Sequence, residues 1–136
     1  MNDARQDRLR KVLAFASVVE IATGLALLID PRFVVTLLVG STTPVEEIPM
    51  GRLPGIAILA LGLACWPNGQ PAKHGSPAFR GMLVYNVLIA AFLVYVFAIE
   101  HIGGVLLWPG VVLHAIVASL LIWTGRRARQ NKLGIQ

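Results

Sequence analysis

Residues 12–29 read VLAFASVVEIATGLALLI, an apolar run that a single acidic residue, Glu20, interrupts. A helix of this length rises ~27 Å, which approaches the ~30 Å thickness of the hydrocarbon core of a bilayer. The run ends at Asp30-Pro31, and proline disfavours a helical conformation in the residue before it. We therefore expect a first membrane-spanning helix over residues 12–29, with a carboxyl group near its middle.

Three further apolar runs follow at residues 51–66, 81–98 and 105–123. Only 14% of the 136 residues are charged, whereas a soluble domain carries roughly a quarter. The sequence therefore predicts an all-α, polytopic membrane protein, with residues 1–136 forming one bundle of four transmembrane helices. Such a chain has no room for a soluble catalytic domain, and its single cysteine, Cys65, excludes a disulfide scaffold.

A shorter apolar stretch, residues 33–39, lies between the first and second of these runs. Its seven residues are too few to cross a bilayer. We expect it to form a short interfacial or re-entrant segment after the first helix. The polar break that follows it contains the acidic pair Glu46-Glu47.

Basic residues are concentrated in the two tails, residues 1–11 and 125–136, and in the loop after the second long run. These three segments hold ten of the twelve Lys and Arg residues, and Arg32 and Arg52 are the other two. Four crossings place the three segments on one side, which the positive-inside rule predicts to be the cytoplasm. Because Arg outnumbers Lys in an Ala-, Val- and Gly-rich chain, we expect a bacterial inner membrane. The tails would then contact anionic lipid rather than nucleic acid.

The polar residues inside the apolar runs are the candidate functional residues, because ionisable groups at this depth are costly. Glu20 and His114 lie ~12–13 Å from the cytoplasmic ends of their helices, and Asn86 lies ~8 Å from its own. Arg52 enters from the opposite side. We expect the bundle interior to collect Glu20, Asn86 and His114. Two interpretations stay open: a structural cluster, with Glu20 protonated or paired with His114 or Arg52, or a proton- or ligand-binding group.

Small residues on the same helices predict close helix packing. The glycines expected at helix contacts are Gly24, Gly51, Gly55, Gly62 and Gly110. No Cys/His cluster suggests a metal, and no motif pairs a nucleophile with a base. The sequence therefore favours a protein that is not an enzyme.

Three stretches resemble the DoxX-like group of small bacterial four-helix membrane proteins, which includes a related family of unknown function. These stretches are GLALLIDP at 24–31, LLVG at 37–40 and GRLPGIAILALGL at 51–63. The residues that carry the resemblance are Gly24, Asp30, Pro31, Arg52 and Gly55. It implies the four-helix fold. Some DoxX-type proteins are associated with quinone-linked oxidation of sulfur compounds, but no residue here matches that chemistry.

The mid-helix Glu20 also resembles the glutamate of the small multidrug-resistance transporters. The ten-to-two charge bias opposes the dual insertion found in those proteins, and the aromatic pattern expected around their drug site is absent from this sequence. We therefore expect an accessory or interaction subunit, or a binder of a hydrophobic small molecule. Proton-coupled transport through Glu20, or an enzyme using Glu20 and His114 as acid and base, are the alternatives.

We predict no cofactor. A quinone and a lipid are the two classes of ligand that stay open. The expected partners are the lipid bilayer, a second copy of the chain or a membrane partner subunit.

Overall fold

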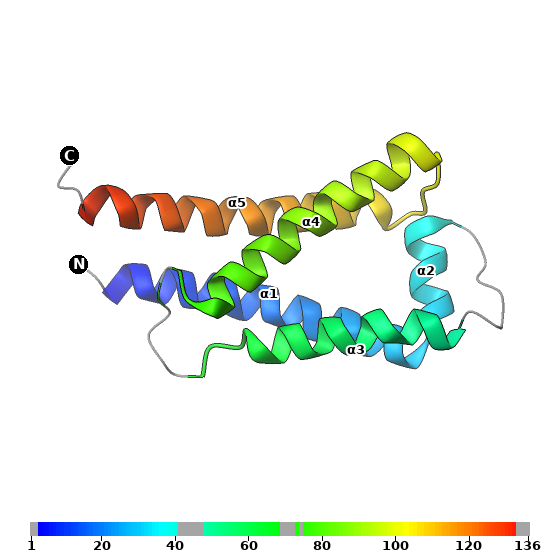
Figure 1. Ribbon diagram of the computed structural model, residues 1–136, viewed down its shortest axis with the longest axis horizontal. Helices are drawn as coiled ribbons and strands as arrows, with labels where there is room; N and C mark the ends of the chain where they lie inside the picture. Colours follow the sequence, from blue (N-terminus) through cyan, green and yellow to red (C-terminus); the bar gives the residue numbers. More distant parts are fainter. Residues whose placement is uncertain (1–2, 41–47, 69–72, 74, 133–136) are drawn as a thin grey trace.

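The computed structural model describes residues 3–40, 48–68, 73 and 75–132 (Figure 1). Every regular element in these residues is an α-helix, which confirms the predicted all-α class. The helices are α1 (Asp3–Ile29), α2 (Pro31–Val39), α3 (Ile48–Ala64), α4 (Pro77–Glu100) and α5 (Leu107–Lys132). The Glu46-Glu47 pair lies outside the described residues.

Three helices are long and apolar enough to cross a membrane: α1 over Gln6–Ile29, α4 over Pro77–Glu100 and α5 over Leu107–Arg126. The fourth apolar helix, α3, is shorter. Its 17 residues rise ~25 Å, somewhat less than the ~30 Å hydrocarbon core. Large apolar side chains such as Leu88 and Ile99 of α4 are exposed, as expected where lipid covers a helix. The apolar helices thus suggest insertion into a membrane.

Helices α1 and α3 pack side by side because glycines allow their backbones to approach closely. A Cβ atom on Gly24 would lie 2.6 Å from the backbone nitrogen of Leu59 and 2.8 Å from the carbonyl oxygen of Gly55. A Cβ on Gly62 would lie 2.8 Å from Cγ1 of Ile21. A Cβ on Gly55 would lie 2.9 Å from a side-chain atom of α1. Real Cβ atoms do not make contacts this short, so Gly24, Gly55 and Gly62 are required for the observed distance between the helices.

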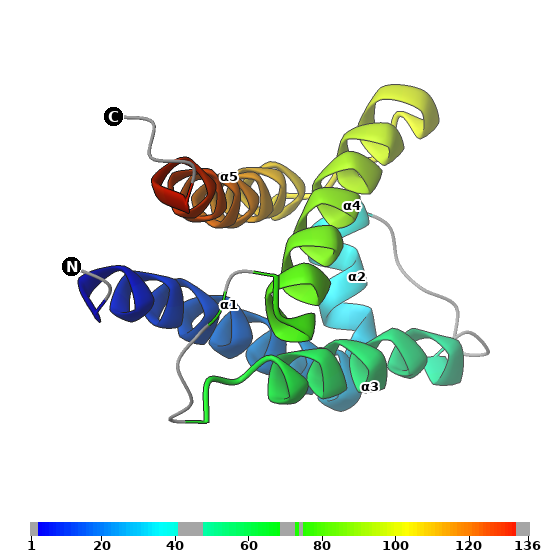
Figure 2. The same cartoon turned by 60° about the vertical axis from the view of Figure 1, so that its left-hand side comes forward.

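The other two glycines singled out above lie at different contacts. A Cβ on Gly51 of α3 would lie 3.0 Å from Cβ of Pro31, at the start of α2. A Cβ on Gly110 of α5 would lie 3.2 Å from Cδ1 of Leu93 on α4. Helix α4 packs against α5 and runs obliquely to all the other long helices (Figure 2).

The short helix α2 lies across one end of the bundle, roughly perpendicular to the long helices (Figure 1). Asp30 caps its first turn by accepting a hydrogen bond from the backbone N–H of Phe33 at 3.1 Å, and Gly40 ends it in the left-handed conformation. The backbone N–H groups of Gly104 and Leu106 donate to the carbonyl oxygens of Leu38 and Leu37, each at 2.8 Å. These bonds satisfy carbonyls in the last turn of α2 and attach it to the segment before α5.

The opposite end of the bundle, where α1 begins and α5 ends, contains the hydrophobic core; we call it the chain-end half. The core side chains come from α1, α4 and α5 and from Cys65, which directly follows α3, and they include Leu9, Leu13, Phe79, Met82 and Leu121. Packing is therefore tight in the chain-end half. The half toward α2 contains a cavity instead, described below.

Candidate functional site

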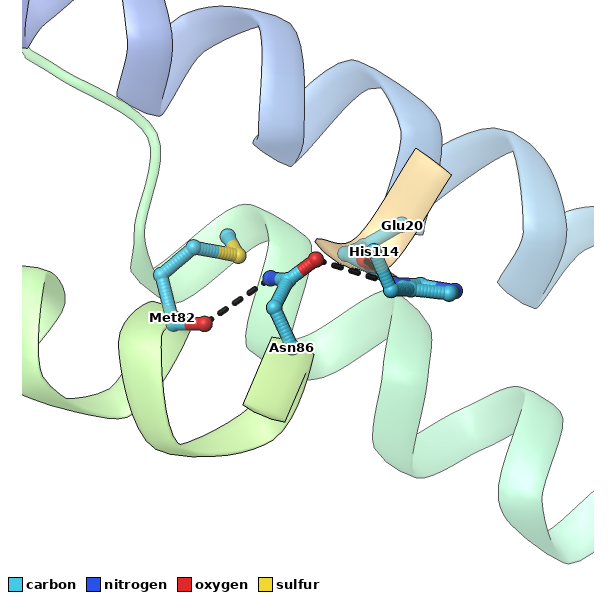
Figure 3. Close-up of polar contacts among 4 residues, drawn as sticks. All are labelled: Glu20, Met82, Asn86 and His114. Carbon is cyan, nitrogen blue, oxygen red and sulfur yellow. Dashed lines mark hydrogen bonds and ion pairs between the residues drawn. The ribbon is translucent and has the colours of Figure 1, made fainter. Parts of the chain in front are cut away.

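A hydrogen bond between Asn86 and His114 connects α4 to α5 in the interior of the bundle (Figure 3). Oδ1 of Asn86 lies 2.8 Å from Nδ1 of His114. The amide nitrogen of Asn86 donates to the carbonyl oxygen of Met82 at 2.8 Å, one turn earlier on the same helix. Asn86 is only 1% exposed, so its amide has both of its interactions inside the protein. Two of the residues predicted to meet in the interior are therefore bonded directly.

Glu20 approaches the same ring nitrogen of His114. Its Oε1 atom is 3.9 Å from Nδ1 of His114, and the residue is 1% exposed. The Tyr85 side chain makes a hydrogen-bonding interaction with the Glu20 carboxyl group. Oε2 of Glu20 and the hydroxyl oxygen of Ser17, one turn earlier, have no hydrogen-bond partner among the described residues. Glu20 is therefore a buried neighbour of His114 Nδ1, and one of its carboxyl oxygens has no partner among the described residues.

Tyr85 belongs to this polar group, although its position in an apolar run did not single it out in the sequence. Its ring meets the His114 ring edge to face, with 5.9 Å between centroids and an interplanar angle of 77°. Tyr85 immediately precedes Asn86 on α4, and the two side chains approach His114 from different directions. The polar group thus consists of Glu20, Tyr85, Asn86 and His114, contributed by α1, α4 and α5.

A cavity of about 470 Å³ lies between this polar group and α2. Its wall is almost entirely apolar and comes from α1, α2, α4 and α5, with Ile58 from α3. The polar side chains in the wall are Thr23, Tyr85 and His114. Glu20 and Asn86 are not part of the wall, so His114 is the member of the predicted trio that a molecule in the cavity would contact.

The cavity opens toward the side of the bundle. Phe33 of α2 and Phe92 of α4 both line it, yet they are 61% and 57% exposed. Residues that line a cavity and are also exposed mark its mouth. An apolar molecule in the surrounding lipid would therefore meet an apolar opening, with a polar group at the far end of the cavity.

The fourth candidate residue, Arg52, lies elsewhere. It is exposed in the first half of α3 and takes no part in the polar group. Among the described residues, no group of three or more His, Cys, Asp or Glu side chains is arranged to hold a metal ion.

The fold and the site together define a small all-helical protein of membrane type with a buried polar group beside an apolar cavity. Comparison with protein-family models, curated protein sequences and solved structures finds no match to the chain. The resemblance to DoxX-like proteins therefore stays a prediction.

Proposed function

We propose that this chain is a four-span inner-membrane protein of DoxX-like type that binds a hydrophobic small molecule, such as a quinone or a lipid, beside His114. The observation that carries this proposal is the combination of an apolar cavity of about 470 Å³ with a polar end formed by Tyr85 and His114. Small-molecule sites are typically concave and apolar, with a few polar groups that orient the ligand. An accessory subunit that holds such a molecule for a partner protein would use the same site.

The packing of α3 along α1 supports four crossings. A helix in such close contact with a spanning helix lies along it and therefore also passes through the bilayer. The shortfall in the length of α3 is only ~5 Å, and Arg52 near its start can extend its side chain to the interface. Helix α1 begins and α5 ends at the same end of the bundle (Figure 1), which agrees with the basic tails sharing the cytoplasmic side.

Two observations favour binding over the two alternatives: the position of Glu20 and the packed core of the chain-end half. An acid–base enzyme needs both groups at the reacting atoms, but only His114 of the two is part of the cavity wall. A transporter needs alternating access to both sides, whereas the chain-end half is closed by the packed core around Leu13, Met82 and Leu121. A cavity with one lateral mouth suits a bound apolar molecule better than a transported one.

Filling the cavity tests this proposal. Leu93 lines it on α4, whereas its neighbour Val94 is 43% exposed and is not part of the wall. We expect L93W to abolish binding of para-octylphenol, a hydrophobic probe, because the larger ring occupies the cavity. V94W places the same ring toward lipid and should bind the probe like the wild type. Native mass spectrometry of the protein released from detergent micelles reads the bound probe directly. Equal binding by L93W and V94W would refute the cavity as the site.

A further inference from the structure

The orientation of the Asn86 amide determines which nitrogen of His114 carries a proton. The amide nitrogen of Asn86 donates to the Met82 carbonyl oxygen, so its oxygen, Oδ1, faces His114. A carbonyl oxygen can only accept a hydrogen bond. Nδ1 of His114, at 2.8 Å from Oδ1, must therefore be the donor and carry the proton.

A neutral imidazole has one protonated nitrogen, so Nε2 of His114 is left with a free lone pair. A charged ring is disfavoured inside an apolar bundle, because burial of a charge without close pairing is costly. Glu20 at 3.9 Å is beyond hydrogen-bonding distance from Nδ1. Figure 3 shows the second ring nitrogen on the side away from Asn86. Because His114 lines the cavity and Asn86 does not, this face of the ring is the one available to a ligand.

The other two polar side chains in the cavity wall, Tyr85 and Thr23, do not offset the acceptor character of Nε2 of His114. The Tyr85 side chain is engaged with the Glu20 carboxyl group. The hydroxyl group of Thr23 can both donate and accept, so it gives no preference. The polar end of the cavity is thus dominated by one hydrogen-bond acceptor, Nε2 of His114, surrounded by apolar side chains.

We infer that the cavity selects apolar molecules whose head group donates a hydrogen bond, such as a phenol or a long-chain alcohol, and that Nε2 of His114 accepts it. This inference rests on the proposed function of the cavity as a binding site. The ligand enters through the lateral mouth between Phe33 and Phe92, and its apolar body lies against α2 and the nearby parts of α4 and α5. A ligand with only acceptor atoms, such as an oxidised quinone, would face the His114 lone pair without donating to it. Among the ligand classes proposed above, the inference therefore favours those that carry a hydroxyl group, a quinol or a lipid with a free hydroxyl.

A competition between two matched probes tests the inference. Para-octylphenol and its methyl ether, para-octylanisole, share one skeleton, but only the phenol donates a hydrogen bond. We expect the wild-type protein in an equimolar mixture to bind the phenol about three- to tenfold more, the range of one net hydrogen bond. Native mass spectrometry separates the two complexes by mass. H114F should lose this preference and still bind the ether, whereas I116L, on the exposed side of α5, should keep it.

The outcomes distinguish this inference from the proposed function. Equal binding of phenol and ether by the wild type, abolished for both by L93W, would overturn the donor selectivity and leave the cavity as a binding site. Binding of neither probe would overturn both. The wild-type competition decides the question even if H114F does not fold. Nitrogen-15 spectra of the histidine rings give an independent readout: a proton on Nδ1 alone supports the inference, and a doubly protonated ring or a proton on Nε2 overturns it.

Discussion

Asn86 and His114 are partners across the α4–α5 contact, with 2.8 Å between Oδ1 and Nδ1. Asn86 is 1% exposed and the His114 side chain is 13% exposed, so water does not readily replace either partner. A buried polar group without a partner in an apolar interior costs several kcal/mol. The pair therefore holds the two helices in one rotational setting and orients the imidazole at the end of the cavity.

A double-mutant cycle between these residues measures the strength of their contact. We expect N86L and H114L each to lower the free energy of unfolding, and the double variant to lower it by less than the sum. The coupling should be about 0.6 kcal/mol and at most about 1.7 kcal/mol, the mean and the maximum found for hydrogen bonds between membrane helices. Steric-trap unfolding in bilayer discs provides the measurement. Strictly additive losses would show that the two side chains do not interact.

Gly24 is required for the close contact between α1 and α3, whereas a glycine on α4 that makes no close contact offers a matched control. G24A would push a methyl group into backbone atoms of Leu59 and Gly55, which cannot move without separating the helices. We expect a loss of about 1–3 kcal/mol in unfolding free energy, as for overpacking of a core.

Gly81 of α4 is the control, because a Cβ there would meet only Cδ1 of Leu61, at 3.8 Å. G81A should be neutral or stabilise the protein by up to about 1 kcal/mol, since alanine favours helix over glycine. Thermal unfolding of both variants in the same detergent compares them. A G24A protein as stable as G81A would mean that the two helices are not closely packed in the membrane.

The sequence was sufficient to predict that Glu20, Asn86 and His114 meet, but not how they are arranged. Glu20, Asn86 and His114 stand out because a polar side chain in an apolar helix avoids lipid, and this reasoning needs no structure. In the structure a carboxyl oxygen of Glu20 and the amide oxygen of Asn86 are both near Nδ1 of His114, and His114 is the one residue of the three in the cavity wall. This arrangement depends on helix rotation and on the oblique path of α4. The periodicity of a single helix determines neither how that helix is rotated in the bundle nor the angle at which it crosses its neighbours.

Three other features illustrate the same limit. Tyr85 is an ordinary member of an apolar run until its ring is placed against His114. The sequence offered Arg52 as a partner for Glu20, but that arginine lies on the exposed side of α3. Likewise, residues 33–39 predict a short segment, yet its position across the bundle end depends on backbone bonds from Gly104 and Leu106. Contacts between distant backbone atoms leave little trace in composition.

Replacing Glu20 separates binding from transport. E20Q keeps the size of the side chain and its ability to bond Tyr85, and position 20 is not in the cavity wall. We expect E20Q to fold and to bind para-octylphenol like the wild type. Proton-coupled transport predicts instead that vesicles with wild-type protein show pH-dependent flux of a cationic dye, and that E20Q abolishes this flux. That result would replace the binding proposal with transport.

The number of crossings is testable by labelling single cysteines with a membrane-impermeant maleimide. Cys65 can stay in place, because it is 4% exposed and the buried thiol should not react. Four crossings predict that K73C and R126C react from the cytoplasmic side, and that M50C and I102C react from the other. If α3 does not cross, K73C and M50C will react from the same side.

The attachment of α2 to the bundle should control how long a ligand stays in the cavity. A Cβ on Gly104 would overlap the carbonyl oxygen of Leu37, and the Gly104 N–H donates to Leu38 at 2.8 Å. G104A should therefore push α2 away from the bundle end. Because Leu37 and Leu38 belong to the cavity wall, we expect para-octylphenol to dissociate faster from G104A than from the wild type.

The neighbouring glycine supplies the control for this prediction. A Cβ on Gly103 would lie 3.3 Å from Cδ2 of Phe97, a side-chain atom that can move aside at low cost. G103A should therefore release the probe at the wild-type rate. Stopped-flow mixing with an excess of a fluorescent competitor measures all three rates. If G104A releases the probe no faster than G103A, α2 does not close the cavity, and the ligand is held by the walls from α1, α4 and α5 alone.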